Sequence, residues 1–96
     1  MRLKKVTIDK IKEAIYDSFG NVNIYLFGSR TNDMKIGGDI DLAVDVDMSR
    51  IEFRKNKIKF LTTLIKKNFD LKIDLVNYNT KDLLLKNQIE KNGILI

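Results

Sequence analysis

The sequence predicts an α+β fold in which a small mixed β-sheet carries helices chiefly on one face. Stretches with apolar residues spaced by threes and fours alternate with short apolar runs that are typical of strands, in the order α-β-β-α-β-α. A chain of 96 residues is long enough to bury one hydrophobic core. We therefore expect a single domain that spans residues 1–96.

The N-terminal part of the chain predicts one helix and two strands. Thr7 can cap a helix over residues 8–19, and Gly20 can end it. The apolar, partly aromatic run 24–27 predicts the first strand. Residues 39–45 alternate between apolar and acidic side chains at their start, so they predict the second strand.

A long helix follows the second strand. Ser49 and Glu52 form a capping box, with serine at the N-cap and glutamate three residues on, and the helix is expected to run to about residue 68. The apolar residues of this helix fall within about half of its circumference. They are Ile51, Phe53, Ile58, Phe60, Leu61, Leu64 and Ile65.

The C-terminal part predicts a strand over 72–77 and a helix over 81–91, capped by Asn79 or Thr80. The apolar residues of that helix are Leu83, Leu84 and Ile89. The apolar tail 94–96 either docks as a short strand or forms an exposed edge for another subunit.

Two aspartates separated by one isoleucine form the most informative motif. A strand turns Asp39 and Asp41 to the same face, where like charges about 4 Å apart repel by roughly 4 kcal/mol at an effective dielectric constant of about 20. A divalent cation can neutralise such a pair, and carboxylate oxygens suit Mg²⁺ or Mn²⁺. Asp74 lies 33 residues after Asp41, which leaves room for a crossover helix. If the strands pair, three carboxylates can hold two metal ions.

The first predicted strand ends at a glycine. Gly28 lets the backbone approach a phosphate closely, and Ser29 and Arg30 follow it. A helical turn at the start of residues 29–36 would offer free N–H groups to an anion. These residues and the carboxylates together predict a site for a metal ion that carries phosphates.

The ordered motifs resemble the minimal nucleotidyltransferases (MNT) of the DNA polymerase β superfamily, in particular the small MNT proteins encoded beside HEPN-domain partners. The resemblance implies the nucleotidyltransferase fold. It also implies that Gly28 and Ser29 hold a nucleoside triphosphate. Asp39, Asp41 and Asp74 would be both the metal ligands and the catalytic residues.

The resemblance covers about residues 23–78, and the chain departs from the usual pattern at Thr31-Asn32-Asp33 and at Gly38. Two cations, Arg30 and Arg54, are further candidates for nucleotide binding. The remaining sequence matches the family less specifically, although its helices fit the fold.

The basic charge is concentrated in one helix. Residues 50–67 hold seven Lys and Arg residues against one acid, whereas the rest of the chain holds eleven against twelve. Arg50, Arg54 and Lys57 form a stripe on the apolar side of its first two turns. Either these side chains extend to solvent at the helix edge, or Arg54 reaches the acidic cluster or the phosphates. We favour a solvated basic face and do not expect direct nucleic-acid binding.

Composition excludes several classes of enzyme. The chain has no cysteine and no histidine, which removes disulfides, thiol nucleophiles, Ser-His catalysis and the usual zinc sites. No apolar stretch is long enough to span a membrane and no signal-peptide pattern is present, so we expect a cytoplasmic protein.

The first functional hypothesis is a Mg²⁺-dependent enzyme that moves a nucleoside monophosphate onto an acceptor hydroxyl. The resemblance implies ATP as the donor and a tyrosine of a HEPN toxin as the acceptor, so that the chain is an antitoxin. The alternatives are a non-catalytic antitoxin that binds a HEPN ribonuclease, and a transferase for small molecules of the antibiotic type. A hetero-oligomer or a homodimer is plausible for so small a domain.

Overall fold

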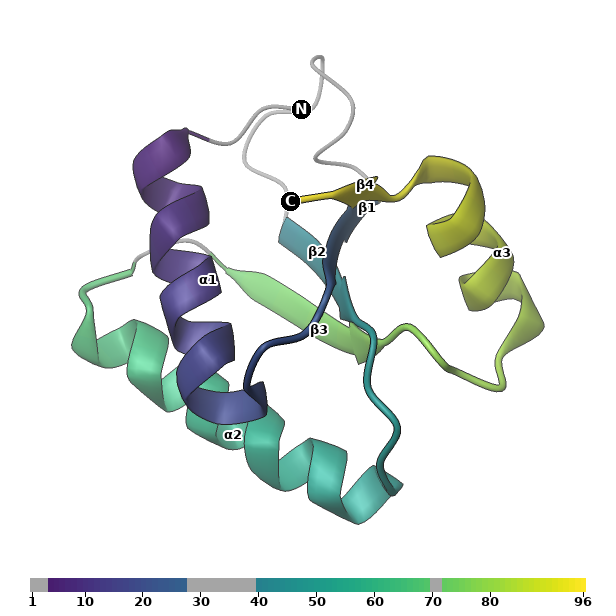
Figure 1. The fold of residues 1–96 in the computed structure, drawn as a ribbon, viewed down its shortest axis with the longest axis horizontal. Helices are drawn as coiled ribbons and strands as arrows, with labels where there is room; N and C mark the ends of the chain where they lie inside the picture. Colours follow the sequence, from purple (N-terminus) through teal and green to yellow (C-terminus); the bar gives the residue numbers. More distant parts are fainter. Residues whose placement is uncertain (1–3, 28–39, 70–71) are drawn as a thin grey trace.

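The computed structural model describes residues 4–27, 40–69 and 72–96. These residues form three helices and four strands (Figure 1). In chain order they are α1 (Lys5–Phe19), β1 (Ile24–Phe27), β2 (Ile40–Val44), α2 (Arg50–Lys66), β3 (Ile73–Asn77), α3 (Leu83–Asn92) and β4 (Ile94–Leu95).

The four strands form one mixed sheet in the order β3-β2-β1-β4. Strand β1 is antiparallel to both β2 and β4, whereas β2 and β3 are parallel. Two parallel neighbours need a long crossover, and α2 supplies it. The predicted mixed sheet and crossover helix are therefore confirmed.

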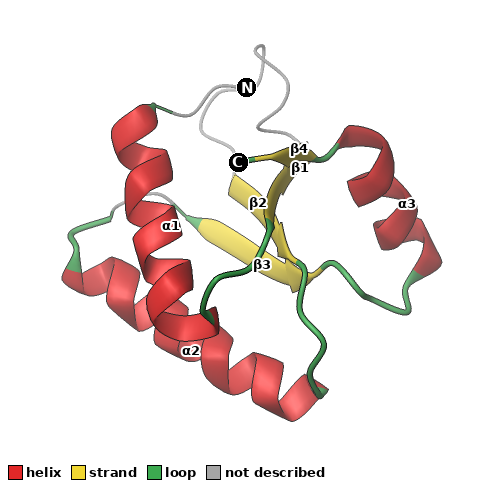
Figure 2. Ribbon diagram, viewed as in Figure 1, coloured by secondary structure: helices red, strands yellow, loops and turns green. Residues whose placement is uncertain are grey.

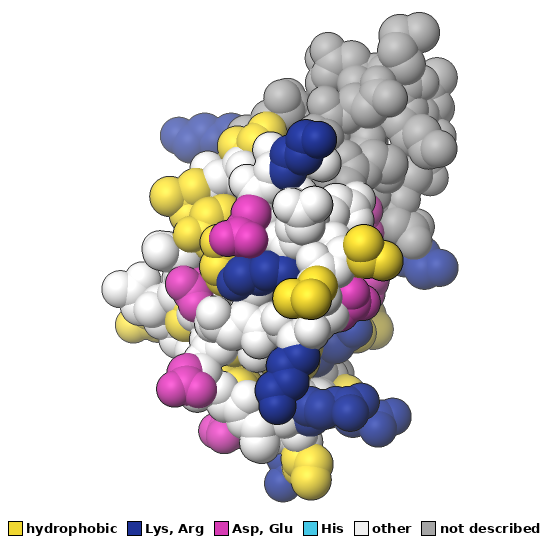
Figure 3. Space-filling view, turned by 90° about the vertical axis from the view of Figure 1, so that its right-hand side faces the viewer, with side chains coloured by type: hydrophobic (Ala, Val, Ile, Leu, Met, Phe, Trp, Pro, Cys, Tyr) yellow, Lys and Arg dark blue, Asp and Glu magenta, His cyan; other side chains and the backbone are white. Residues whose placement is uncertain are grey.

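The helices lie on both faces of the sheet but not equally. Helices α1 and α2 pack together on one face, and α3 lies on the other (Figures 1 and 2). Figure 3 looks onto the side that carries α3. Successive residues of a strand point to opposite faces of the sheet. The strands therefore contribute side chains to two hydrophobic cores, one on each face. The predicted α+β class, with helices chiefly on one face, is confirmed.

The larger core lies between the sheet and the α1–α2 layer. Its fully buried members include Ile11 and Ile15 of α1, Leu42 of β2, Phe60 of α2 and Leu75 of β3. A smaller cluster under α3 consists of Phe27, Ala43 and Ile89, with Tyr25, Val76, Tyr78 and Leu85 packed against it. None of the described helices is both long and apolar enough to cross a membrane.

The prediction for the start of α1 was wrong by about one turn. The helix begins at Lys5, after the extended residue Lys4, and not after a Thr7 cap. The Lys4 carbonyl accepts a hydrogen bond from the Ile8 N–H at 3.0 Å, so the helical ladder already runs past Thr7. The side chain of Lys4 makes no capping hydrogen bond. A capping side chain was therefore a misleading signal here.

The start of α3 also differs from the prediction. Asp82 caps the helix, since its carboxylate accepts hydrogen bonds from the Leu84 and Leu85 N–H groups at 3.1 and 3.2 Å. Asn79 is not free to cap, because its amide donates to the Asp45 carboxylate at 2.7 Å and to a carbonyl of the loop after β2. The Thr80 hydroxyl accepts from the Asp82 N–H at 3.1 Å. Both residues that were predicted as caps therefore make their side-chain hydrogen bonds before the first turn of α3.

The predicted apolar faces of α2 and α3 were too broad. Ser49 does cap α2, with the Glu52 N–H donating to its hydroxyl at 3.1 Å. Of the seven apolar residues of α2, however, only Phe60 and Leu64 are buried. Ile51, Ile58 and Ile65 of α2 and Leu83 and Leu84 of α3 are more than half exposed. Each helix contacts the rest of the fold along a narrow stripe, so residues at the margins of the apolar arc remain in solvent.

The C-terminal tail docks on the sheet. Tyr25 and Leu26 of β1 pair with Leu95 and Ile94 of β4, and the Ile96 N–H donates to the Ile24 carbonyl at 3.0 Å. Of the two alternatives for the tail, the structure therefore shows the short strand.

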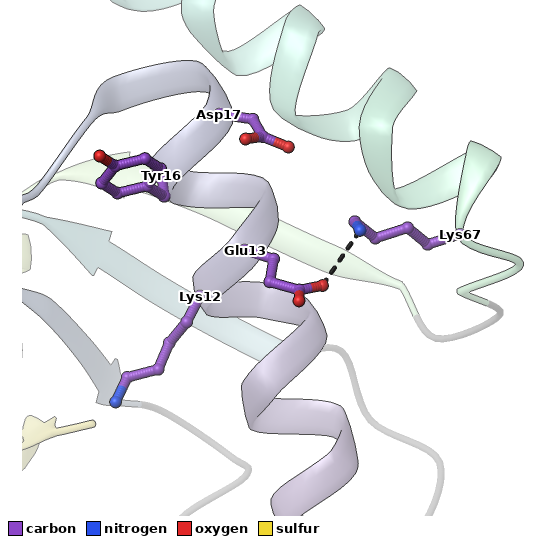
Figure 4. Close-up of a pocket in the computed structure, with 5 residues that line it drawn as sticks. All are labelled: Lys12, Glu13, Tyr16, Asp17 and Lys67. Carbon is purple, nitrogen blue, oxygen red and sulfur yellow. Dashed lines mark hydrogen bonds and ion pairs between the residues drawn. The ribbon is translucent and has the colours of Figure 1, made fainter.

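Side chains at both ends of the α1–α2 contact hold the two helices side by side. The rings of Phe19 and Phe53 lie 5.4 Å apart at one end. Toward the other end, Glu13 and Lys67 point at each other across a shallow pocket, with 3.1 Å between their charged atoms (Figure 4). Both partners are partly exposed, so this ion pair adds at most about 1 kcal/mol, and apolar packing supplies most of the stability.

We expect Phe60→Ala to lower the free energy of unfolding by about 3–5 kcal/mol, because a fully buried aromatic ring is lost and a cavity remains. Ile58→Ala, two residues earlier on the same helix, should change it by less than about 1 kcal/mol, because Ile58 is 59% exposed. Urea unfolding followed by circular dichroism measures both. Equal losses would mean that Ile58 is buried in solution.

Candidate functional site

Two of the predicted carboxylates lie side by side on neighbouring strands. Asp41 of β2 and Asp74 of β3 are register partners in the parallel pair. The residues on either side of them along each strand are buried toward α1 and α2. Strand alternation therefore turns both aspartates to the opposite face of the sheet, the face that carries α3. This adjacency follows from the parallel pairing that the sequence predicted.

The two carboxylates have different surroundings. The side chain of Asp74 is 59% exposed on an edge strand, whereas Asp41 is half-buried on a central one. On the other side of Asp41, its register partner in β1 is Phe27, which is only 5% exposed. Asp41 thus lies between an apolar ring and a second carboxylate, and a cation bound there would reduce the repulsion between the two carboxylates.

Four other residues that were predicted to bind the metal ion or the nucleotide lie outside the described residues. They are Gly28, Ser29, Arg30 and Asp39. Among the described residues, no group of three His, Cys, Asp or Glu side chains could hold a metal ion. What this part of the chain does provide is a pair of hard oxygen donors, the kind that Mg²⁺ and Mn²⁺ take.

A lysine that was not among the predicted site residues approaches this pair. The Lys57 ammonium of α2 lies 3.6 Å from a carboxylate oxygen of Asp74. Both side chains are partly exposed, so the contact contributes little to stability. The sequence did contain the signal, since Lys57 belongs to the Arg50, Arg54 and Lys57 stripe. Of the two alternatives for this stripe, contact with the acidic cluster was considered for Arg54, and the structure shows such a contact for Lys57, one turn further on.

Arg54 lines a groove between the start of α2 and the segment that follows β3. This groove has a volume of about 1250 Å³, and Lys57 also lines it. The basic stripe of α2 therefore continues from the groove to Asp74. The assignment of Arg54 to nucleotide binding remains a prediction.

A stacked pair of tyrosines lies on the same face as the carboxylates. The rings of Tyr25 and Tyr78 stack at 4.9 Å, and the Lys86 ammonium of α3 lies 3.6 Å above the Tyr78 ring. Lys86 also donates to the Tyr78 carbonyl at 2.9 Å. Partial burial raises the pKa of the Tyr78 hydroxyl, and the charge of Glu90 raises it further, so Tyr78 stays neutral at physiological pH. These contacts hold α3 against the sheet. No motif in the sequence predicted them.

The profile of the polymerase β nucleotidyltransferases matches residues 9–96. The chain belongs to this family. Its helices and mixed sheet are those of a nucleotidyltransferase fold, as the motifs predicted.

Individual relatives are more distant. Poly(A) RNA polymerase protein 2 of Saccharomyces cerevisiae is 29% identical over 77 residues, which are 79% of this chain and 13% of that protein. The chain therefore spans only about an eighth of the length of this curated relative. The likeness therefore concerns a small part of a much larger protein.

Solved structures show the same fold. A structure of tri-AMPylated Shewanella oneidensis HEPN toxin in complex with MNT antitoxin matches with a TM-score of 0.66 at 25% identity, over 97% of this chain and 71% of the other. A toxin–antitoxin structure with AMP-PNP matches equally well, over 91% and 69%. A putative nucleotidyltransferase is 27% identical with a TM-score of 0.59, over 93% and 96%.

We expect Asp41 and Asp74 to repel each other when no divalent cation is present. Asp41→Asn and Asp74→Asn each remove this repulsion completely. In the double variant it is also lost once, so the effect of the double variant is smaller than the sum of the two single effects. The coupling energy in a double-mutant cycle should therefore be about 0.5–3 kcal/mol, below the roughly 4 kcal/mol of unscreened neighbours because Asp74 is 59% exposed and solvent screens its charge. Urea unfolding in the presence of EDTA measures it, and the cycle cancels other contacts of either residue.

Asp47→Asn combined with Asp74→Asn is the matched control, because Asp47 lies six residues beyond Asp41 and outside β2. That pair should be additive within error. A coupling energy near zero for Asp41 with Asp74 would contradict the adjacency of the two carboxylates.

Proposed function

We propose that the chain is a Mg²⁺-dependent nucleotidyltransferase that moves AMP from ATP onto a hydroxyl of a protein acceptor. The observation that carries the proposal is the register pairing of Asp41 and Asp74 in a member of the polymerase β family. Neighbouring strands fix the two carboxylates side by side, so little rearrangement would be needed for them to bind a cation. Asp39, two residues before Asp41 in sequence, would complete the set.

In this proposal Asp39, Asp41 and Asp74 hold the metal ions, and Gly28 and Ser29 hold the triphosphate. Bound Mg²⁺ would supply positive charge to the phosphates and favour the ionised acceptor oxygen. The acceptor oxygen forms a bond to the α-phosphorus while the bond to pyrophosphate breaks. We propose that Asp74 also helps to take the acceptor proton, and its 59% exposure supports access of an acceptor to it.

The cations near the carboxylates would serve the negatively charged substrate. Lys57 pairs with Asp74 across 3.6 Å, and this pairing offsets part of the charge repulsion at the site. In the substrate complex Lys57 would interact with phosphate oxygens. Arg30 and Arg54 are proposed as further phosphate contacts.

We further propose a HEPN-domain toxin as the protein partner and a tyrosine of that toxin as the acceptor. Support comes from the likeness to the complex of AMPylated HEPN toxin with MNT antitoxin and to the toxin–antitoxin structure with AMP-PNP. In this role the chain acts as an antitoxin, because attachment of AMP blocks a residue of the toxin.

The direct test is mass spectrometry of a HEPN protein encoded beside this chain, after incubation with the chain, ATP and Mg²⁺. We expect the HEPN protein to gain the mass of AMP on tyrosine. Asp41→Asn and Asp74→Asn should each slow the transfer by about 100-fold or more, because several kcal/mol of charge stabilisation is lost. Asp47→Asn is the control and should retain the activity.

Formation of a complex with the HEPN protein without any mass gain would contradict the transferase and indicate an antitoxin that acts by binding alone. Transfer to a small-molecule hydroxyl but to no protein would contradict the protein acceptor.

Divalent ions and nucleotide should stabilise the chain together. We expect the melting temperature to rise with ATP and Mg²⁺ and to rise much less with either one alone, because the carboxylates and the phosphates share the same ion. Differential scanning fluorimetry measures this. The Asp41→Asn variant should lose most of the shift, and an equal shift with ATP in the presence of EDTA would argue against a metal-bridged site.

A further inference from the structure

The groove beside β3 has cationic side chains on its opposite walls. Arg50, Arg54 and Lys57 line it from α2, and Lys81 lines it from the segment between β3 and α3. Arg50, Arg54 and Lys81 are exposed, and Lys57 is half-buried. Figure 3 shows Lys and Arg side chains gathered in the lower part of the face that carries α3. We name this feature, with these four residues, the docking groove. Because Arg54 and Lys57 are assigned to phosphates in the function proposed above, Arg50 and Lys81 are the cations that remain for a second anionic occupant.

The acidic side chain of the docking groove is already engaged. Asp82 is the acidic residue among those that line it, and its carboxylate caps α3 through the Leu84 and Leu85 N–H groups. Ser49 caps α2 at the other wall, so the N-terminal end of that helix also faces the groove with its partial positive charge. The lining carries four cationic side chains against the carboxylate of Asp82, and Asp74 and Asp45 contact two lining residues from beside the groove. The balance remains positive and favours an anionic occupant.

The floor of the docking groove is apolar. Leu75 and Val76 of β3, Phe53 of α2 and Leu85 of α3 line it, and the aliphatic Ile51 at its rim is 72% exposed. A small anion or a phosphate chain would leave this apolar surface uncovered. An occupant with acidic side chains could pair with the cations of the walls, and aliphatic side chains on the same occupant could cover the apolar floor.

The same composition argues against a single strand of nucleic acid. Such sites offer exposed aromatic faces on which bases stack. The aromatic ring that lines the docking groove is Phe53, which is half-buried and packed against Phe19. The stacked Tyr25 and Tyr78 pair is covered by Lys86 and is not among the lining residues.

We propose that the docking groove binds an acidic segment of a protein partner that also carries aliphatic side chains. The groove adjoins Asp74, because Lys57 both lines it and pairs with that carboxylate. A partner held there would have its neighbouring residues beside the transfer site. Only this last consequence rests on the function proposed above, since docking itself needs neither ATP nor a metal ion.

The test is fluorescence anisotropy with a labelled short peptide of glutamate and leucine, in the presence of EDTA and without nucleotide. We expect the peptide to bind, and we expect Arg50→Glu and Lys81→Glu each to weaken binding about tenfold or more, because each replaces a charge-assisted contact by repulsion. Arg50 is the first residue of α2, where a glutamate is compatible with the helix. Lys59→Glu, an exposed residue of α2 outside the groove, is the matched control and should change affinity little.

Two further probes sharpen the result. A peptide with serine in place of leucine should bind more weakly, because the apolar floor is left uncovered. A single-stranded RNA of similar length that binds as tightly, and loses affinity with the same two variants, would overturn the proposal in favour of nucleic acid. Failure of the peptide to bind, or equal losses for all three charge reversals, would also overturn it. These outcomes are independent of transfer, so a failed transferase assay leaves the docking result intact.

Discussion

The parallel pairing of β2 and β3 is the constraint on which the rest of the structure depends. Parallel neighbours cannot be joined by a tight turn, so the chain must leave the sheet after β2 and return through a helix. Helix α2 makes that crossover and buries Phe60 and Leu64 against the sheet. The same pairing sets Asp41 opposite Asp74. One backbone arrangement therefore produces both the core and the adjacent carboxylates.

The adjacency of Asp41 and Asp74 lowers the stability of the fold but suits the binding of a cation. Two like charges on neighbouring strands repel, and the half-buried Lys57 offsets part of that repulsion at Asp74. The two carboxylates, with Phe27 packed beside Asp41, are compatible with the proposed cation site.

Helix α2 serves three purposes through three of its faces. One face packs on the sheet and on α1, one is exposed with its lysines in solvent, and its first two turns present the basic stripe to the docking groove. This division explains why its apolar residues were hard to assign from periodicity. Ile51 belongs to the rim of the groove and not to the core.

The sequence by itself indicated the family and the order of the elements as far as α3, and it left room for a pairing of β2 with β3 that would set Asp41 beside Asp74. Strand alternation and the length of the crossover are local properties, and the nucleotidyltransferase motifs are contiguous, so both can be found without coordinates. The sequence also singled out the basic stripe, but it left open whether the stripe extends to solvent or whether Arg54 reaches the acidic cluster or the phosphates. The roles of Gly28, Ser29, Arg30 and Asp39 remain predictions, because these residues lie outside the described part of the chain.

Only the tertiary structure decided which apolar residues are buried, which polar residues cap the helices, and which cation meets Asp74. Asn79 is unavailable as a cap because it bonds Asp45, which lies 34 residues away in the sequence. Lys57 meets Asp74, which lies 17 residues further along the sequence and on another element. Ile58 and Ile65 stay exposed because the contact stripe of α2 is narrower than its apolar arc. Each of these outcomes depends on the relative placement of two elements, which no local pattern encodes.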